Sequence, residues 1–150
     1  MSDAQSTVNA WVSNNEKIVF TNGCFDLLHI GHIKYLQEAR SLGDRLVVAI
    51  NSDASVKRLK GASRPIKDEE NRLYCMAALS MVDLVVLFED DTPIDVIKSL
   101  NPNVLVKGGD WSIDQIVGSE YVLARGGSVQ SLKFIDGQST TSFVQKLDNK

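Results

Sequence analysis

Cysteine, proline, histidine and long apolar runs are all scarce in this sequence of 150 residues. The two cysteines, Cys24 and Cys75, have no metal-ligand spacing, which argues against a zinc site and a disulfide-stapled fold. No apolar run approaches the roughly 20 residues of a membrane-spanning helix. Residues 1–16 lack the basic start and apolar block of a secretory signal, so we expect a cytoplasmic protein.

An excess of positive charge is also missing, because the net charge is −3 at pH 7. A general nucleic-acid or membrane-surface binder needs a basic face, so we expect neither partner, although a local basic pocket remains compatible with this composition. Hydrophobic residues make up 43% of the chain and charged residues 23%, which is typical of a globular protein. The length suits one folded domain.

Short apolar runs alternate with segments of helical periodicity, and this alternation predicts an α/β fold. The run at 45–50 is apolar throughout, which indicates a strand covered on both faces and therefore a parallel sheet. We predict a single Rossmann-like, doubly wound domain with its ligand crevice at the carboxyl ends of the strands. The five expected strands are 17–21, 45–50, 83–88, 104–107 and 129–135.

Helices are expected between these strands, starting near Gly31, at Glu69 and after a Thr92 cap with Pro93 in the first turn. Further helices are expected at 115–124 and after residue 139, the last with Phe143, Val144 and Leu147 on one side. Residues 57–67 are expected to be a polar, basic connection. Residues 1–16 are interpreted as a polar, loosely docked lead-in to a domain at 17–150.

The chemistry is concentrated after the first strand, in the segment TNGCFDLLHIGH at 21–32. His29 and His32 flank Gly31 where a helix begins, and helix N-termini present N–H groups and a positive dipole end to phosphate. Gly31 would let a phosphate approach the backbone. A single histidine here would be a cap or surface residue, but a pair around glycine favours phosphate binding. No third ligand for a metal lies nearby.

This segment resembles the HxGH signature of the nucleotidylyltransferase superfamily. The similarity extends from Lys17 to Leu147 through TNGCFD, HIGH, NSD, RPI, KGGD and GQSTT, in this order. Within the superfamily, the sequence is most similar to the adenylyltransferases that act on D-glycero-β-D-manno-heptose 1-phosphate. The resemblance implies transfer of AMP from ATP to that acceptor, with pyrophosphate and ADP-heptose as products, for the lipopolysaccharide core.

The resemblance also implies site residues. His29, His32, Lys60 and Arg64 are expected to act on the phosphates, while Arg72 and Trp111 are left without a definite role. Five cations without an acid among them lie in the basic connection, where a solvated loop is the alternative to a phosphate clamp. The expected nucleotide-binding residues are Asn22, Gly23, Cys24, Phe25, Asp26, Gly31, Asn51, Asp53, Lys107, Gly108, Gly109, Asp110, Ser139, Thr140 and Thr141.

Mg²⁺ is the expected cofactor, carried by the ATP phosphates rather than by protein ligands, with Asp26 as a candidate for its shell. A homodimer is expected from the resemblance. A cytidylyltransferase for glycerol 3-phosphate is the alternative within the family, although residues 134–138 differ from the Arg-Thr-x-Gly-Ile stretch typical of that branch. A nucleotide-binding module without catalysis is the alternative of another class. An aminoacyl-tRNA synthetase fragment is disfavoured, because no KMSKS-like loop is present.

Overall fold

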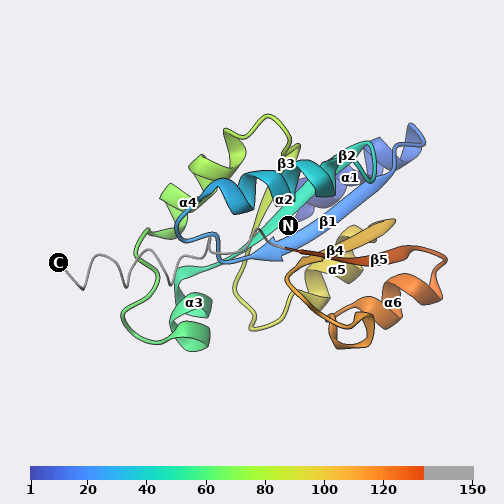
Figure 1. Cartoon of the computed structure of the whole chain (residues 1–150). Helices are drawn as coiled ribbons and strands as arrows, with labels where there is room; N and C mark the ends of the chain where they lie inside the picture. Colours follow the sequence, from blue (N-terminus) through green and yellow to red (C-terminus); the bar gives the residue numbers. More distant parts are fainter. Residues whose placement is uncertain (134–150) are drawn as a thin grey trace.

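The computed structural model describes residues 1–133, and these form an α/β domain around one sheet (Figure 1). All five strands are parallel and lie in the order β3-β2-β1-β4-β5, as the apolar runs predict. The order of connection reverses between β1, the middle strand, and its neighbour β4. A ligand crevice forms at the carboxyl ends of the strands at such a switch point. The strands are β1 (Ile18–Gly23), β2 (Arg45–Asn51), β3 (Leu84–Phe88), β4 (Val104–Gly108) and β5 (Ser128–Leu132).

Helices cover both faces of the sheet (Figure 1). One face is covered by α2 and α4, and the other by α1, α5 and α6, while α3 stands at the carboxyl ends of the strands. The helices are α1 (Ser2–Ser13), α2 (Ile30–Arg40), α3 (Asp53–Lys60), α4 (Glu69–Ala77), α5 (Ile94–Leu100) and α6 (Ser119–Ala124), with a 3₁₀ turn, η1 (Ile113–Gln115).

Alternation along each strand divides the core into two clusters. In β1, Ile18 and Phe20 pack toward α1 and α5, whereas Val19 packs toward α2. Because successive side chains of a strand point to opposite faces, a strand that is apolar throughout can contribute to both clusters. The interior strands therefore hold the sheet rigid, and the polar residues at their carboxyl ends are placed on a fixed edge.

The N-terminal segment differs from the expected loose lead-in. Residues 2–13 form α1, in which Val8 is 1% exposed and Trp11 packs against the same cluster. The guanidinium of Arg45 lies 5.1 Å from the centre of the Trp11 ring and pairs with Glu16. The sequence of α1 is mostly polar and has few apolar residues, so its pattern does not indicate that it is a helix packed against the core. The proposed domain boundary at residue 17 stays a prediction.

Three further boundaries differ from the sequence prediction. The basic connection begins as helix, because α3 extends to Lys60 and only residues 61–68 form a loop. Pro93 rather than Thr92 occupies the N-cap of α5. The helix expected at 115–124 starts only at Ser119, since Gly118 has a positive φ of 88°. The last expected helix and residues 134–135 of the fifth strand lie outside the described residues.

Within residues 1–133, no helix combines the length and the apolar character that crossing a membrane requires.

Candidate active site

The turn between β1 and α2 brings the two histidines together at the carboxyl edge of the sheet. His29 is the N-cap of α2, and its Nδ1 accepts a hydrogen bond from the Gly31 N–H at 3.1 Å. Because Nδ1 accepts, the neutral ring carries its proton on Nε2, which is then a donor. The rings of His29 and His32 lie in contact, with their centroids 3.9 Å apart and their planes tilted by 33°. The two histidines therefore pack against each other at this edge.

His32 lines a cavity and is held from a second side by Phe25, whose ring centroid lies 5.3 Å away. Phe25 has a positive φ of 46°, which is uncommon for an aromatic residue and marks a constrained turn. Burial, followed by the charges of His29 and Lys60, lowers the pKa of His32 from 6.5 to about 4. The ring is therefore neutral at physiological pH and acts as a hydrogen-bonding group.

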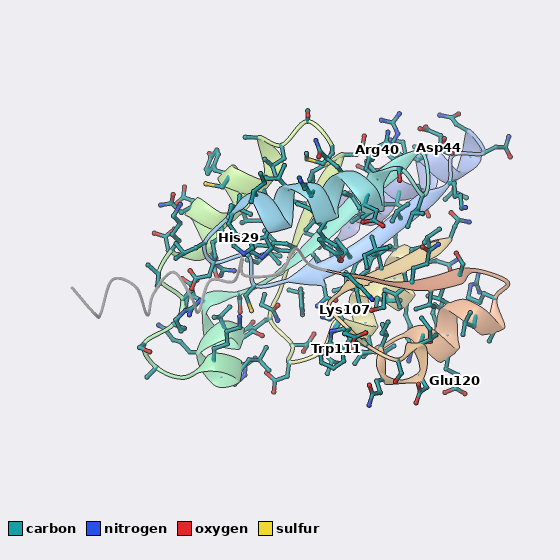
Figure 2. The ribbon with its side chains drawn as sticks, in the orientation of Figure 1. His29, Arg40, Asp44, Lys107, Trp111 and Glu120 are labelled. Carbon is teal, nitrogen blue, oxygen red and sulfur yellow. The ribbon has the colours of Figure 1, made fainter. Side chains whose placement is uncertain are left out.

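Two cavities open at this edge and share a wall. The smaller has a volume of about 230 Å³ and contains His32 and Tyr35, and the larger has about 450 Å³ and contains Trp111. Figure 2 shows Lys107 and Trp111 near each other, with His29 nearer to the start of α2. The shared wall consists of the end of β1 and two lysines: Asn22, Gly23, Cys24, Lys60 and Lys107.

Lys60 and Lys107, the cavity lysines, carry the positive charge of that wall. Lys60 ends α3 and Lys107 lies in β4, and neither forms a salt bridge with a carboxylate of residues 1–133. Burial lowers the pKa of Lys107; Cys24 partly opposes this, and the charge of Lys60 lowers the pKa by a smaller amount. A partly buried cation without an anion is unfavourable. The wall is therefore suited to bind a polyanion.

Asp26 organises the loop beside the smaller cavity. Its side chain is 1% exposed and accepts hydrogen bonds from Arg64 Nε at 2.7 Å and from the N–H groups of Ile66 and Lys67, both at 2.9 Å. Burial alone would raise the pKa of Asp26, but the hydrogen bonds from Lys67, Ile66 and Arg64 outweigh it, and the pKa lies below its usual value. These bonds hold the 61–68 loop against the first turn.

The hydrogen bonds to Asp26 argue against the prediction that this residue takes part in the coordination shell of Mg²⁺. With its oxygens engaged by Arg64 and two backbone groups, the carboxylate does not fit the role of a metal ligand. The described part of the chain contains no group of three His, Cys, Asp or Glu side chains placed to hold an ion.

Arg72 forms a second buried connection and is 1% exposed. Its guanidinium donates to Lys67 O at 3.1 Å, to Cys24 O at 2.8 Å and to Asp53 Oδ1 at 2.9 Å. It thus joins the first turn, the start of α3 and the 61–68 loop. The sequence suggests Asp68 or Glu69 as its partner, but the structure pairs it with Asp53. Asp26, Arg64, Arg72 and Asp53 together are called the anchor cluster below.

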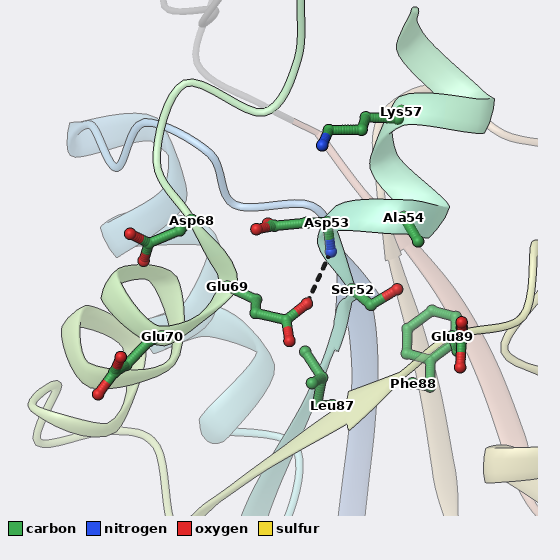
Figure 3. A pocket seen from close by; sticks show the side chains of 10 residues that line it. All are labelled: Ser52, Asp53, Ala54, Lys57, Asp68, Glu69, Glu70, Leu87, Phe88 and Glu89. Atoms are coloured by element: carbon green, nitrogen blue, oxygen red, sulfur yellow. Dashed lines mark hydrogen bonds between the residues drawn. The ribbon is translucent and has the colours of Figure 1, made fainter. Parts of the chain in front are cut away.

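A third cavity, of about 930 Å³, lies elsewhere, beside the start of α3 (Figure 3). There Glu69 accepts a hydrogen bond from the Asp53 N–H at 2.8 Å. Lys57 lines this cavity, whereas Lys60 lines the other two. Repulsion would disfavour a phosphate in this third cavity, because its lining contains Lys57 but also five carboxylates, from Asp53, Asp68, Glu69, Glu70 and Glu89.

The structure brings most of the predicted residues to the two smaller cavities. Those that line them are Asn22, Gly23, Cys24, Phe25, Asp26, His32, Asn51, Lys60, Lys107 and Gly108. Those that do not are His29, Gly31, Asp53, Arg64, Gly109 and Asp110. For Asp53 and Arg64 the ion pairs give the physical reason, because their charged groups face partners in the anchor cluster. Ser139, Thr140 and Thr141 lie outside the described residues.

Tyr35 is the main residue of the smaller cavity that sequence reasoning misses. Its helical spacing places it on the apolar face of α2, yet its hydroxyl pairs with Thr21 Oγ1 and donates to Val106 O at 3.5 Å. Burial raises the pKa of Tyr35, so the hydroxyl stays protonated. The one available signal is the polar Thr21 directly after the apolar run at 18–20.

Comparison with known proteins gives consistent relatives. The family model described as "Cytidylyltransferase-like" matches residues 20–143. "Bifunctional protein HldE" of Citrifermentans bemidjiense is 58% identical over 135 residues, 90% of this chain and 28% of that protein. The protein of the same name from Nitrobacter hamburgensis is 56% identical over 144 residues, 96% of this chain and 29% of that protein. The chain thus spans less than a third of the length of these relatives.

A solved structure of similar size also matches. It is that of the lipopolysaccharide core biosynthesis protein from Thermoplasma volcanium, with 31% sequence identity and a TM-score of 0.66. The match covers 82% of this chain and 99% of that one, so the two folds agree over nearly the whole of the smaller protein.

Proposed function

The chain belongs to the cytidylyltransferase-like family, and from this premise we propose that it is an adenylyltransferase of lipopolysaccharide core biosynthesis. In the proposed reaction, AMP passes from ATP to D-glycero-β-D-manno-heptose 1-phosphate, and the products are ADP-heptose and pyrophosphate. The name and title of the relatives, "Bifunctional protein HldE" and a lipopolysaccharide core biosynthesis protein, support this direction. The motif resemblance supports the heptose branch.

One observation carries the proposal: two lysines without carboxylate partners among residues 1–133 meet a neutral His32 where β1 leads into α2. A triphosphate and an acceptor phosphate repel each other, so bringing them together requires preorganised positive charge and donors. Lys60 and Lys107 supply the charge, and His32 supplies a donor near the N-terminus of α2. A site for neutral metabolites would not need this arrangement.

The proposed reaction is an in-line displacement at the α-phosphorus of ATP. An oxygen of the acceptor phosphate forms the new bond to phosphorus, and the bond from that phosphorus to the bridging oxygen breaks, so that its electrons leave with pyrophosphate. The acceptor is already an anion, and no general base is required. His32 and Lys60 stabilise the charge that grows on the leaving group, with His29 holding His32 in place.

Arg64 is assigned a different part from Lys60. Through Asp26 it keeps the 61–68 loop closed beside the phosphates, which makes it a positioning residue. Ser139 and Thr140, which lie outside the described residues, are proposed from the resemblance to hold pyrophosphate. Mg²⁺ enters the proposal as part of the ATP substrate, bound to its phosphates. A homodimer and a cytoplasmic location complete the proposal.

The test is product formation by the purified protein. We would incubate it with ATP or CTP, Mg²⁺ and either D-glycero-β-D-manno-heptose 1-phosphate or glycerol 3-phosphate, and measure pyrophosphate and the mass of the product. The expected result is formation of ADP-heptose with ATP and the heptose phosphate, and no product with CTP or with glycerol 3-phosphate. CDP-glycerol would replace the proposal by the cytidylyltransferase alternative. Calorimetric binding of ATP without pyrophosphate from any acceptor would replace it by a non-catalytic module.

A further inference from the structure

The larger of the two cavities has a rigid aromatic wall that the proposed chemistry leaves without a role. Trp111 is 47% exposed, and its indole Nε1–H donates to Gly108 O at 3.1 Å. The backbone N–H of Trp111 donates to Ser131 Oγ at 3.1 Å, and the Ser131 hydroxyl donates to Gly109 O at 2.6 Å. The 108–111 turn is thereby fixed to β5, and the exposed indole has a defined orientation.

Gly109 allows this geometry. Its φ is 121°, and a Cβ at this position would lie 2.7 Å from Trp111 Nε1. An ordinary exposed tryptophan needs no such accommodation. A large apolar side chain held at the mouth of a cavity offers a flat surface for a ligand at little cost in conformational entropy.

The other side chains of the larger cavity suit a hydroxylated molecule with its phosphate at one end. Asn51, Asp91, Thr92 and Gln115 can donate to or accept from hydroxyl groups. Asp91 is paired with Arg58, whereas Lys60 and Lys107 have no such partner among residues 1–133 and attract phosphate at the wall shared with the smaller cavity. The two lysines therefore set the direction in which a sugar phosphate would lie.

We propose that the larger cavity is the acceptor subsite, in which the sugar ring lies against the indole of Trp111 and the phosphate lies on Lys107. The inference rests on the proposed function and adds to it the residues that select the acceptor. ATP would place its phosphates in the smaller cavity, beside His32. The two phosphates would then meet at the shared wall, where transfer requires them.

The first test separates the two Michaelis constants. Trp111→Leu should raise the KM for D-glycero-β-D-manno-heptose 1-phosphate by about tenfold or more, because it removes the aromatic surface, and should leave the KM for ATP within about twofold. Tyr74→Leu is the matched control, since Tyr74 is 72% exposed on α4 and lines neither cavity. A raised KM for ATP with an unchanged KM for the acceptor would place the nucleotide against Trp111 and overturn the proposal.

The second test does not need turnover. The chain has two tryptophans, so Trp11→Phe leaves Trp111 as the one indole fluorophore. In the presence of a non-hydrolysable ATP analogue, D-glycero-β-D-manno-heptose 1-phosphate should change this fluorescence saturably, and the analogue alone should not. The same titration with Lys107→Met added should require about tenfold more sugar phosphate, while Lys34→Met, on the exposed side of α2, should not.

The outcomes of the two tests are distinguishable. If the wild-type protein releases no pyrophosphate but Trp11→Phe shows the fluorescence change, the proposed function fails and the acceptor subsite is retained. A protein that makes ADP-heptose with no fluorescence change and an unaltered KM in Trp111→Leu would retain the function and refute the subsite. A change with glycerol 3-phosphate and none with the sugar phosphate would also refute it.

Discussion

The anchor cluster and the cavity lysines lie within one small region, yet they use positive charge in opposite ways. Arg64 and Arg72 are matched by Asp26 and Asp53 and donate to backbone carbonyls or carboxylates. The cavity lysines have no such carboxylate within residues 1–133. Matched cations fix the shape of a loop, whereas unmatched cations leave charge available for a ligand. The run of basic residues at 57–67 contains both kinds.

The most direct test of this difference between the anchor cluster and the cavity lysines is Asp26→Ala. Removing one partner of a buried ion pair leaves Arg64 without its carboxylate and two backbone donors without an acceptor, so the free energy of unfolding should fall by about 3–5 kcal/mol. The measurement is urea unfolding followed by circular dichroism. Arg58→Ala is the control: it breaks the exposed pair with Asp91 and should lower stability by less than about 1 kcal/mol. Equal losses would contradict the distinction.

His32→Ala tests the ligand side of the comparison. Loss of one preorganised donor costs about 3 kcal/mol of transition-state stabilisation, or a factor of about 10² in kcat. The fold should stay intact, as judged by the thermal unfolding midpoint and the circular dichroism spectrum. Near-normal pyrophosphate release by a folded His32→Ala protein would rule out the assigned role.

Lys107→Met tests the same difference from the side of the cavity lysines, because activity should fall while stability stays nearly constant or rises. Loss of a charge-assisted contact to phosphate should lower kcat/KM by about tenfold or more. The free energy of unfolding should stay within about 0.5 kcal/mol of the parent or rise, since the variant no longer buries a cation without an anion. Steady-state kinetics and urea unfolding on the same preparation decide the matter. A loss of stability comparable to that of Asp26→Ala would assign Lys107 to the anchor cluster.

A further effect is a dependence of stability on pH. Burial first, then His29 and Lys60, lower the pKa of His32 from 6.5 to about 4. The unfolded chain therefore binds a proton at higher pH than the folded chain, and this group's contribution to stability is lost as the pH falls from 6.5 towards 4. Across this window the parent should lose more stability than His32→Asn, as measured by urea unfolding at several pH values. Parallel curves would contradict the lowered pKa.

Much of the fold follows from the sequence, because most of its strands contain an apolar run and many of its turns contain glycine or proline. Five parallel strands and the start of α2 are confirmed by the structure. Helix α1 is missed, since Val8 and Trp11 are isolated among polar residues and their burial depends on a distant partner, α5. Long-range packing of this kind leaves no local pattern.

The sequence predicts which residues gather at the site, but it does not predict which of the basic ones form ion pairs. Spacing brings His32, Lys60 and Lys107 to one place, as expected of motifs at the carboxyl ends of strands. Which basic residues pair with acids depends on contacts across 38 positions for Arg64 with Asp26 and 19 positions for Arg72 with Asp53. A charge run in the sequence does not reveal these partners. The pairing separates Arg64 from Lys60 although they lie four residues apart.

The larger cavity is built mainly from segments that the core does not need. Leu59, Thr92, Trp111, Gln115 and Val117 belong to neither buried cluster, and only Ile116 of this rim does. Substitutions there would leave the packing of the sheet unchanged, while the residues that act on the phosphates stay attached to rigid strands and α2. Evolution, or a protein engineer, could therefore exchange one acceptor for another by altering a few rim positions on an unaltered catalytic scaffold.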